Sequence, residues 1–288
     1  MFFIGIDIGG TKIKGILREG KKILSRLEKS TPKDQIEILR AILYLIDSLI
    51  KQSNVNQKEI GGIGLAIAGI LDLNKGKIIK SKNIPAINGL TIRKVIKKEI
   101  GLEKVRIDND ANCFLLGEIK AGSAQGINNI LGITLGSGVG GGIWLNNKIY
   151  SGNNGTAAEF GWMIIREKRD NLLSLEDLCS RKWFLSNIQK EPKEIYSLAK
   201  SGDKNALNIW QSYGENLGIG LSNLINIFNP SIIILGGGIS QASQFFRQTM
   251  KKKIKDLVLS PLAKKTKIIK SKAPNKAGAI GASYLFGK

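Results

Sequence analysis

Residues 2–12 have the sequence FFIGIDIGGTK, and this stretch decides the fold. An apolar run with one acid leads directly into paired glycines, and a second apolar run over 13–17 follows them. The pattern predicts two strands around a turn at Gly9-Gly10-Thr11-Lys12. Paired glycines let backbone N–H groups approach phosphate oxygens, while the threonine adds a hydroxyl donor and the lysine a cation. A plain Gly-Gly hairpin explains this turn alone equally well.

Asp7 stands at the end of the first predicted strand, where a carboxylate can hold Mg²⁺. Mg²⁺ dehydrates reluctantly, so we expect the contact to run through water. Further along, Thr31-Pro32 is typical of a helix start, with the threonine as N-cap and an apolar helical face following it.

A second glycine turn, Gly136-Ser137-Gly138, lies between apolar runs at 130–135 and 142–145. It satisfies the pattern G-x-G-x-x-G, but a strand follows it where a dinucleotide-binding fold needs a helix. The segment GIDIG at 5–9 aligns with GITLG at 132–136, an offset of 132 − 5 = 127. Gly15-Ile16 falls on Gly142-Ile143 at the same offset, so we expect two halves built on one strand–turn–strand unit.

Asp108-Asn109-Asp110 follows a predicted strand at 105–107 and opens a predicted helix that runs to about residue 121. These polar side chains could simply cap the helix. The carboxyl end of a strand is also where α/β sheets carry their active sites.

In chain order, these motifs resemble the successive signatures of the ROK family (repressors, open reading frames and sugar kinases). Other matching segments lie at 83–85, 88–90, 155–161 and 236–238. The resemblance implies an α/β fold of the actin/hexokinase type, with two ribonuclease-H-like domains facing a central cleft. We expect the first domain over 1–120 and the second over 121–274, with a C-terminal helix in 275–288 packing back on the first.

The resemblance also implies roles for individual residues, with Asp110 as the catalytic base. For Glu176, an acid that stabilises a helix N-terminus is an equal alternative to a sugar contact. The implied sugar-binding residues are Gly69, Asn88, Gly89, Asn109, Asp110, Glu159, Trp162 and Glu176. The implied nucleotide-binding residues are Asp7, Gly9, Gly10, Thr11, Lys12, Gly136, Ser137, Gly138, Gly236 and Gly237.

The sequence departs from the family pattern at the zinc motif. Trp162 stands where the family has a histidine, and residues 163–178 contain no cysteine. The whole chain has no histidine and two cysteines, so a tetrahedral zinc site is not expected. Trp162 either stacks on a sugar ring, with room for a substituted sugar, or is a core tryptophan.

We therefore predict an ATP-dependent, glucokinase-like sugar kinase that transfers the γ-phosphoryl group to a hydroxyl of a hexose or hexose derivative, with Mg²⁺ as cofactor. A kinase for a substituted sugar, such as a β-glucoside or N-acetylhexosamine, is one alternative. A non-catalytic sugar-binding regulator is an alternative of another class. The absence of histidine excludes mechanisms that need an imidazole base.

The net charge of +21 suggests a nucleic-acid partner, but the lysines are dispersed in short groups and few aromatics accompany them. We favour a general lysine bias and expect no nucleic-acid partner. No apolar run approaches the roughly 20 residues needed to span a bilayer, and no signal peptide is apparent. The expected location is cytoplasmic, and a homodimer fits the family. A family repressor would carry a DNA-binding domain before the first glycine turn.

Overall fold

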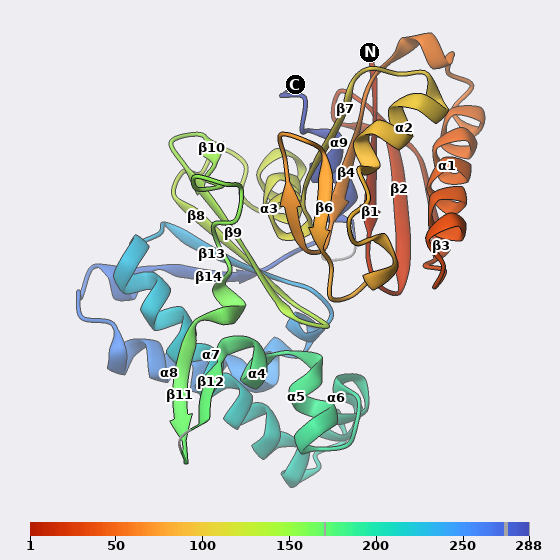
Figure 1. Ribbon diagram of the computed structural model, residues 1–288. Coiled ribbons are helices and arrows are strands. Elements are labelled where there is room, and N and C mark those ends of the chain that lie inside the picture. The colour runs from red at the N-terminus through yellow and green to blue at the C-terminus, as the bar shows by residue number, and fades with distance from the viewer. Residues whose placement is uncertain (170, 274–275, 288) are drawn as a thin grey trace. The chain divides into compact units, whose positions relative to one another are not determined.

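The computed structural model describes residues 1–169, 171–273 and 276–287, which form two compact units (Figure 1). Unit 1 comprises Met1–Gly126, Ile149–Ala157 and Asn275–Lys288. Unit 2 comprises Ile127–Lys148 and Ala158–Pro274. The chain therefore leaves unit 1, returns to it for a short segment, and contributes its C-terminal helix to it.

Unit 1 is built on a five-stranded sheet in the order β3-β2-β1-β4-β7. Strands β1, β4 and β7 run parallel to one another, while β2 is antiparallel to both β1 and β3. The strands are β1 (Phe2–Ile8), β2 (Lys12–Glu19), β3 (Lys22–Ser30), β4 (Ile60–Ile67) and β7 (Val105–Asn109).

The two faces of this sheet are covered differently because residues alternate along each strand. Ile4, Ile6 and Ile8 belong to the buried cluster that also contains the apolar face of α1 (Gln35–Gln52). On the opposite face, a Cβ at Gly5 would overlap the backbone carbonyl of Ala279 in α9 (Ala277–Ser283). Glycine thus lets the C-terminal helix approach the central strand backbone to backbone, and Figure 1 shows this blue helix beside the red strands.

The remaining elements of unit 1 connect and cover these strands, and α3 packs on α9. They are η1 (Gln57–Glu59), β5 (Ile70–Asp72), β6 (Lys77–Lys80), η2 (Pro85–Ile87), α2 (Ile92–Ile100) and α3 (Asp110–Ala121).

Unit 2 repeats the strand order of unit 1, as β10-β9-β8-β13-β14, with its central strand again first in the chain. The parallel pairings β8–β13 and β13–β14 match β1–β4 and β4–β7 of unit 1, and the antiparallel pairing β8–β9 matches β1–β2. This confirms the predicted duplicated α/β fold. The strands are β8 (Ile130–Leu135), β9 (Val139–Leu145), β10 (Lys148–Ile149), β13 (Ile232–Gly236) and β14 (Lys267–Lys270).

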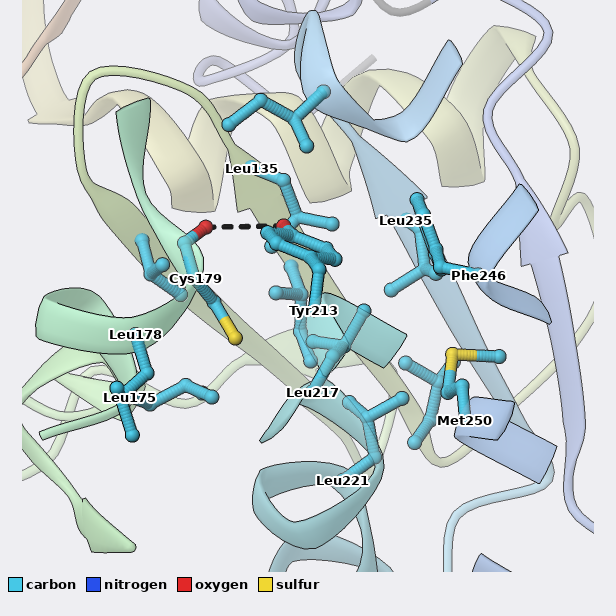
Figure 2. Close-up of a cluster of buried hydrophobic side chains, with 14 of the residues drawn as sticks. Leu135, Leu175, Leu178, Cys179, Tyr213, Leu217, Leu221, Leu235, Phe246 and Met250 are labelled. Carbon is cyan, nitrogen blue, oxygen red and sulfur yellow. Dashed lines mark hydrogen bonds between the residues drawn. The ribbon is translucent and has the colours of Figure 1, made fainter. Parts of the chain in front are cut away.

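Helices pack on the unit 2 sheet around a core rich in leucine and aromatic residues (Figure 2). Buried Tyr213 of α7 lies at its centre and donates its hydroxyl to the backbone carbonyl of Cys179, at 3.0 Å. Cys179 and Cys113 are both free and buried. The elements are η3 (Phe160–Trp162), β11 (Ile164–Lys168), β12 (Asn171–Ser174), α4 (Leu175–Cys179), α5 (Arg181–Asn187), α6 (Pro192–Lys200), α7 (Lys204–Phe228), η4 (Ile239–Ala242), α8 (Ser243–Leu257) and η5 (Ala263–Lys265).

The duplication needs one correction, which concerns the length of the turns. The innermost pair of the first hairpin is Ile8–Ile13, and that of the second is Leu135–Val139. The offset is therefore 135 − 8 = 127 on the first strand but 139 − 13 = 126 on the second. Because the second turn is one residue shorter, Gly15 corresponds to Gly141 and the predicted match to Gly142 is wrong.

The predicted start of the first helix is also wrong. Asp34 caps α1 instead, since its carboxylate accepts hydrogen bonds from the N–H groups of Ile36 (2.8 Å) and Glu37 (3.2 Å). Thr31 donates its hydroxyl to the Gly9 carbonyl at 2.6 Å, and its N–H to the Thr11 carbonyl at 2.9 Å. The residue predicted as a cap therefore braces the first glycine turn.

Across the described ranges, none of the helices combines the length and the apolar character that crossing a membrane requires.

Candidate active site

The pairing register of unit 1 sets four side-chain positions in one row across neighbouring strands. Lys14 of β2 pairs with Asp7 of β1, Asp7 with Ala66 of β4, and Ala66 with Asp108 of β7. Paired residues point to the same face of a sheet, so both carboxylates lie on the face that Gly5 opens to α9. The small Ala66 between them is fully buried and packs against Cys113 and Ala282.

Burial changes the protonation of both carboxylates in this row. It raises the pKa of Asp7 to about 6, although the positive charge of Lys14 offsets part of the effect. Burial also raises the pKa of Asp108, whose Oδ1 accepts hydrogen bonds from Asn112 Nδ2 (2.9 Å) and from the Asn109 N–H (2.7 Å). These bonds favour the ionised form and restrain the shift.

Asp110, the predicted base, is the first residue of α3. Asn109 caps this helix, with its Oδ1 accepting from the Ala111 N–H at 2.8 Å and its Nδ2 donating to the Gly69 carbonyl at 3.2 Å. Burial and then the negative charge of Asp7 raise the pKa of Asp110 to about 6. Two interacting carboxylates thus lie at the end of β1 and the start of α3.

The first glycine turn is fixed by a hydrogen bond within it and by hydrogen bonds from Thr31. The Gly9 N–H donates to the Lys12 carbonyl at 3.1 Å, closing the turn that Thr31 braces. The Lys12 ammonium forms an ion pair with Glu28 of β3 on the exposed surface, which lowers the pKa of Glu28. Exposed pairs of this kind contribute little to stability, so this ammonium can exchange partners at small cost.

The predicted sugar-binding residues of unit 1 are linked through the segment after β6. Gly69 follows β4 with φ +142°, and a Cβ there would overlap the Lys80 carbonyl. Asn88 is exposed, and its Oδ1 accepts from the Ser81 N–H at 2.6 Å. Gly89 has φ +78° and open space around it. Because Asn109 also bonds to Gly69, the structure groups these residues beside the helix that begins with Asp110.

In unit 2 the structure brings together the two glycine segments predicted to bind the nucleotide. Gly236 pairs with Thr134, and a Cβ at Gly237 (φ +80°) would overlap the carbonyl of Leu135. The next residue, Gly136, begins the second turn, and its N–H donates to the Gly138 carbonyl at 3.0 Å. The two glycine segments of unit 2 therefore meet backbone to backbone.

The other predicted residues of unit 2 occupy two different settings. Glu159 precedes η3 and is exposed, and Trp162 ends η3 with 58% of its surface exposed. That exposure excludes the core alternative for Trp162. Glu176 lies in α4, where its Oε2 accepts from the Val139 N–H at 3.0 Å. This carboxylate therefore contacts the second glycine turn.

The residues at the end of β1 fit a magnesium ion held largely by water and phosphate. Asp7 is a partly buried carboxylate under desolvation, with Asp110 close enough to interact electrostatically, and a divalent cation would offset both charges. Mg²⁺ typically takes one or two protein carboxylates and keeps several waters. Among the residues that the structure describes, no group of three or more histidine, cysteine or acidic side chains could hold a metal ion.

Sequence reasoning missed Lys14 as a member of the site, and it named Asp108 only as part of a polar segment at a strand end. Both stand in the row with Asp7, but a single strand sequence does not state which residue of the next strand lies beside it. The alternation of apolar and polar residues in 12–19 places Lys14 on the same face as Lys12 and gave a partial signal. Thr31 had no such signal, because its bonds depend on where β3 ends.

The fold and these residues define an α/β protein of the actin/hexokinase type with a duplicated sheet. The ROK family model matches residues 3–288, so the chain belongs to the ROK family. The N-acetyl-D-glucosamine kinase of Photobacterium profundum is 31% identical over 308 residues, covering 98% of each chain. The glucokinase of Thermotoga maritima is 27% identical, covering 98% of this chain and 96% of its own.

A solved structure agrees with these relatives. The ROK family glucokinase of Streptomyces griseus, in complex with glucose and AMPPNP, matches with a TM-score of 0.83 and 27% identity, covering 99% of both chains.

Proposed function

We propose that the chain is an ATP-dependent sugar kinase that phosphorylates a hydroxyl group of a hexose or hexose derivative. The observation that carries this proposal is Asp110, a partly buried carboxyl at the start of α3, directly after the edge strand β7, with a pKa raised to about 6. A general base works best when its pKa lies near the operating pH. The names of the relatives and of the matching solved structure support the same class of reaction.

The proposed reaction gives Asp110 a single task. Its carboxylate accepts the proton of the sugar hydroxyl as that oxygen forms a bond to the γ-phosphorus of ATP and the bond to the β-phosphate oxygen breaks. ADP leaves, and Asp110 holds the proton until solvent removes it. Asn109, fixed to Gly69 and to the start of α3, keeps the carboxylate at its place on the helix.

The nucleotide side rests on backbone groups. In unit 2 we assign phosphate contacts to the N–H groups of Gly136–Gly138 and adenosine contacts to Gly236 and Gly237, where the absence of side chains lets a ligand approach. In unit 1 the N–H groups of Gly9–Lys12 are the proposed phosphate donors. Mg²⁺, when bound, neutralises charge on the phosphates, and Asp7 would hold it through water. Lys12 supplies a further cation once it leaves Glu28.

The sugar contacts that we assign to unit 1 are Asn88 and Asn109, and those that we assign to unit 2 are Glu159 and the exposed ring of Trp162. Sugars present C–H faces that pack on aromatic rings, and Trp162 offers such a face where a histidine would offer a hydrogen bond. A sugar with a bulky substituent is therefore an acceptable substrate. The two named relatives act on different sugars by their names, so free glucose and N-acetylhexosamines both belong in a first assay.

The test is ADP release with Mg-ATP against glucose, mannose, fructose, N-acetylhexosamines and β-glucosides. We expect turnover with at least one of them. With that sugar, Asp110→Asn should lower kcat by about 10³-fold, within the usual range for loss of a general base, while sugar affinity stays within a few-fold.

Turnover by Asp110→Asn comparable to that of the wild type would remove Asp110 from its assigned role. Tight sugar binding without turnover for any sugar would favour the alternative class, a non-catalytic sugar-binding regulator. Failure to bind either a sugar or ATP would contradict both functions.

A further inference from the structure

The second glycine turn of unit 2 is held at both ends by one short segment of the chain. Glu176 Oε2 accepts a hydrogen bond from the Val139 N–H at 3.0 Å, at the end of the turn. The Arg181 N–H donates to the Gly136 carbonyl at 2.8 Å, at its beginning. Two anchors five residues apart in sequence thus span a turn whose only side chain is that of Ser137.

Gly138 and Glu176 fill one space between them. A Cβ added at Gly138 would overlap Glu176 Oε2, the far end of a flexible side chain, so a larger residue here would push the carboxylate away. The φ of Gly138 is not in the left-handed region, so the backbone conformation does not by itself demand glycine. Glycine at this position therefore lets the carboxylate of Glu176 approach the turn and accept its hydrogen bond.

The segment that carries Glu176 is fixed to the core of unit 2. Leu175, Leu178 and Cys179 of α4 are buried in the cluster of Figure 2, and Tyr213 of α7 donates its hydroxyl to the Cys179 carbonyl. Arg181 pairs through its guanidinium with Glu191 just before α6. The anchors thus connect the turn to a rigid core, so thermal motion of a glycine-rich loop is restrained.

We propose that Glu176 is a positioning residue for the second glycine turn, holding the N–H groups of residues 136–139 in the arrangement that binds the phosphates of the nucleotide. This inference rests on the proposed function for its ligand, but its structural part concerns the turn alone. It differs from the role that family resemblance assigns to this glutamate, since it acts on the nucleotide side. The physical basis is preorganisation: donors already in place bind a phosphate without a further loss of entropy.

The experiment measures binding of AMPPNP by calorimetry without sugar, so that no turnover is required. Glu176→Ala should weaken binding about 10-fold, because the Val139 N–H loses its acceptor and the turn its anchor. Glu176→Gln should stay within about threefold of the wild type, because the amide oxygen still accepts. Asp177→Ala is the matched control: it removes the cap of α4, in which Asp177 bonds to Ser174, and should change the affinity little.

A double-mutant cycle tests the shared space. Gly138→Ala alone should weaken AMPPNP binding at least 10-fold, because its Cβ displaces the Glu176 carboxylate. In the Glu176→Ala background the same change should cost less than threefold, because the space is then free. Additive effects would overturn the proposal, as would a Glu176→Ala variant with altered sugar affinity and unchanged AMPPNP affinity.

Amide hydrogen exchange of the peptides that cover 136–139 separates this inference from the proposed function. Glu176→Ala should speed exchange there at least 10-fold, and Glu176→Gln much less, with melting temperatures confirming that each variant is folded. If the wild type bound no AMPPNP, the proposed function would fail. The exchange result would still test whether Glu176 restrains the turn. Unchanged exchange in Glu176→Ala would refute the anchor itself.

Discussion

The central strands of the two units carry the same topology and opposite chemistry. In unit 1 the row across the sheet is Lys14, Asp7, Ala66 and Asp108, whereas in unit 2 the equivalent strands place Gly140, Thr134 and Gly236 side by side. The first row contains three ionisable side chains, which are partly buried. The second row contains two glycines, and Thr134 is its only side chain.

This difference shows how one sheet can serve two tasks. A desolvated carboxylate has a raised pKa and can take up a proton near neutral pH, which suits the reacting end of the proposed reaction. A row of glycines exposes backbone and space, which suits a ligand held by N–H groups. Both units share one sheet topology. The residues at the register position of Asp7 and Thr134 differ, and so does the chemistry proposed for each unit.

The largest expected effect concerns the close contact that unit 1 makes through Gly5. Gly5→Ala would drive a Cβ into the Ala279 carbonyl, and because both partners are backbone the strain cannot be relieved by a rotamer. We expect a loss of about 3 kcal/mol or more in the free energy of unfolding, measured by denaturant titration.

Gly238→Ala is the control for this change. Its added Cβ meets open space, and its backbone is already in the right-handed helical region (φ −63°, ψ −38°), so stability should stay within about 0.5 kcal/mol. Equal stability of the two variants would contradict the backbone-to-backbone packing of α9.

Exchanging the equivalent residues of the two rows should give different kinetic defects. Asp7→Thr removes the carboxylate assigned to the hydrated magnesium ion, so kcat should fall by about 10²-fold or more at saturating ATP. Thr134→Asp places a negative charge beside the second turn, so KM for ATP should rise about 10-fold through repulsion while kcat changes less. Steady-state kinetics in both substrates distinguish these outcomes, and the same defect in both variants would erase the proposed division.

A further effect is expected on the stability of the ligand-free protein. The pKa of Asp110 is about 6 when folded and 3.8 as its ordinary value, so its contribution to stability is fully present below pH 3.8 and is lost as pH rises through 6. At pH 8 Asp110→Asn should therefore be more stable than the wild type by up to about 3 kcal/mol.

This gain should shrink as pH falls from 7 toward 4.5, where the wild-type carboxyl is protonated. Urea unfolding at several pH values, without magnesium or nucleotide, measures it. A variant that is less stable than the wild type at pH 8 would contradict the desolvation of Asp110.

Local sequence pattern predicted much of the architecture, because strands β1 and β8 are apolar runs that end at glycine residues. The transition from β7 to α3 was predicted in the same way, from an apolar run followed by polar residues that can cap a helix. The pattern failed where a residue bonds outside its own element. Thr31 has the chemistry of an N-cap, yet it bonds to Gly9 and Thr11, because β3 brings it beside the first turn.

In the candidate site, too, residues in short local motifs were predicted, whereas contacts between separate elements were not. Asp7, Asp110 and both glycine turns could be predicted, because each lies at a strand end within a short motif. The place of Lys14 and Asp108 beside Asp7 could not be predicted, because it comes from the register between strands. The two alternatives for Glu176 could not be separated by sequence, since a helix-capping acid and a ligand-binding acid have the same local context.

By itself, the sequence determined the repeated strand–turn–strand unit, the positions of the carboxylates and glycines on it, and the lack of histidine for a zinc site or an imidazole base. The tertiary structure alone decided which residues share a row, which carboxyls lose water, and that Glu176 meets the turn at Gly138. The physical reason is range: turns and strand ends are set by neighbouring residues, whereas register, desolvation and steric exclusion arise between segments far apart in the chain.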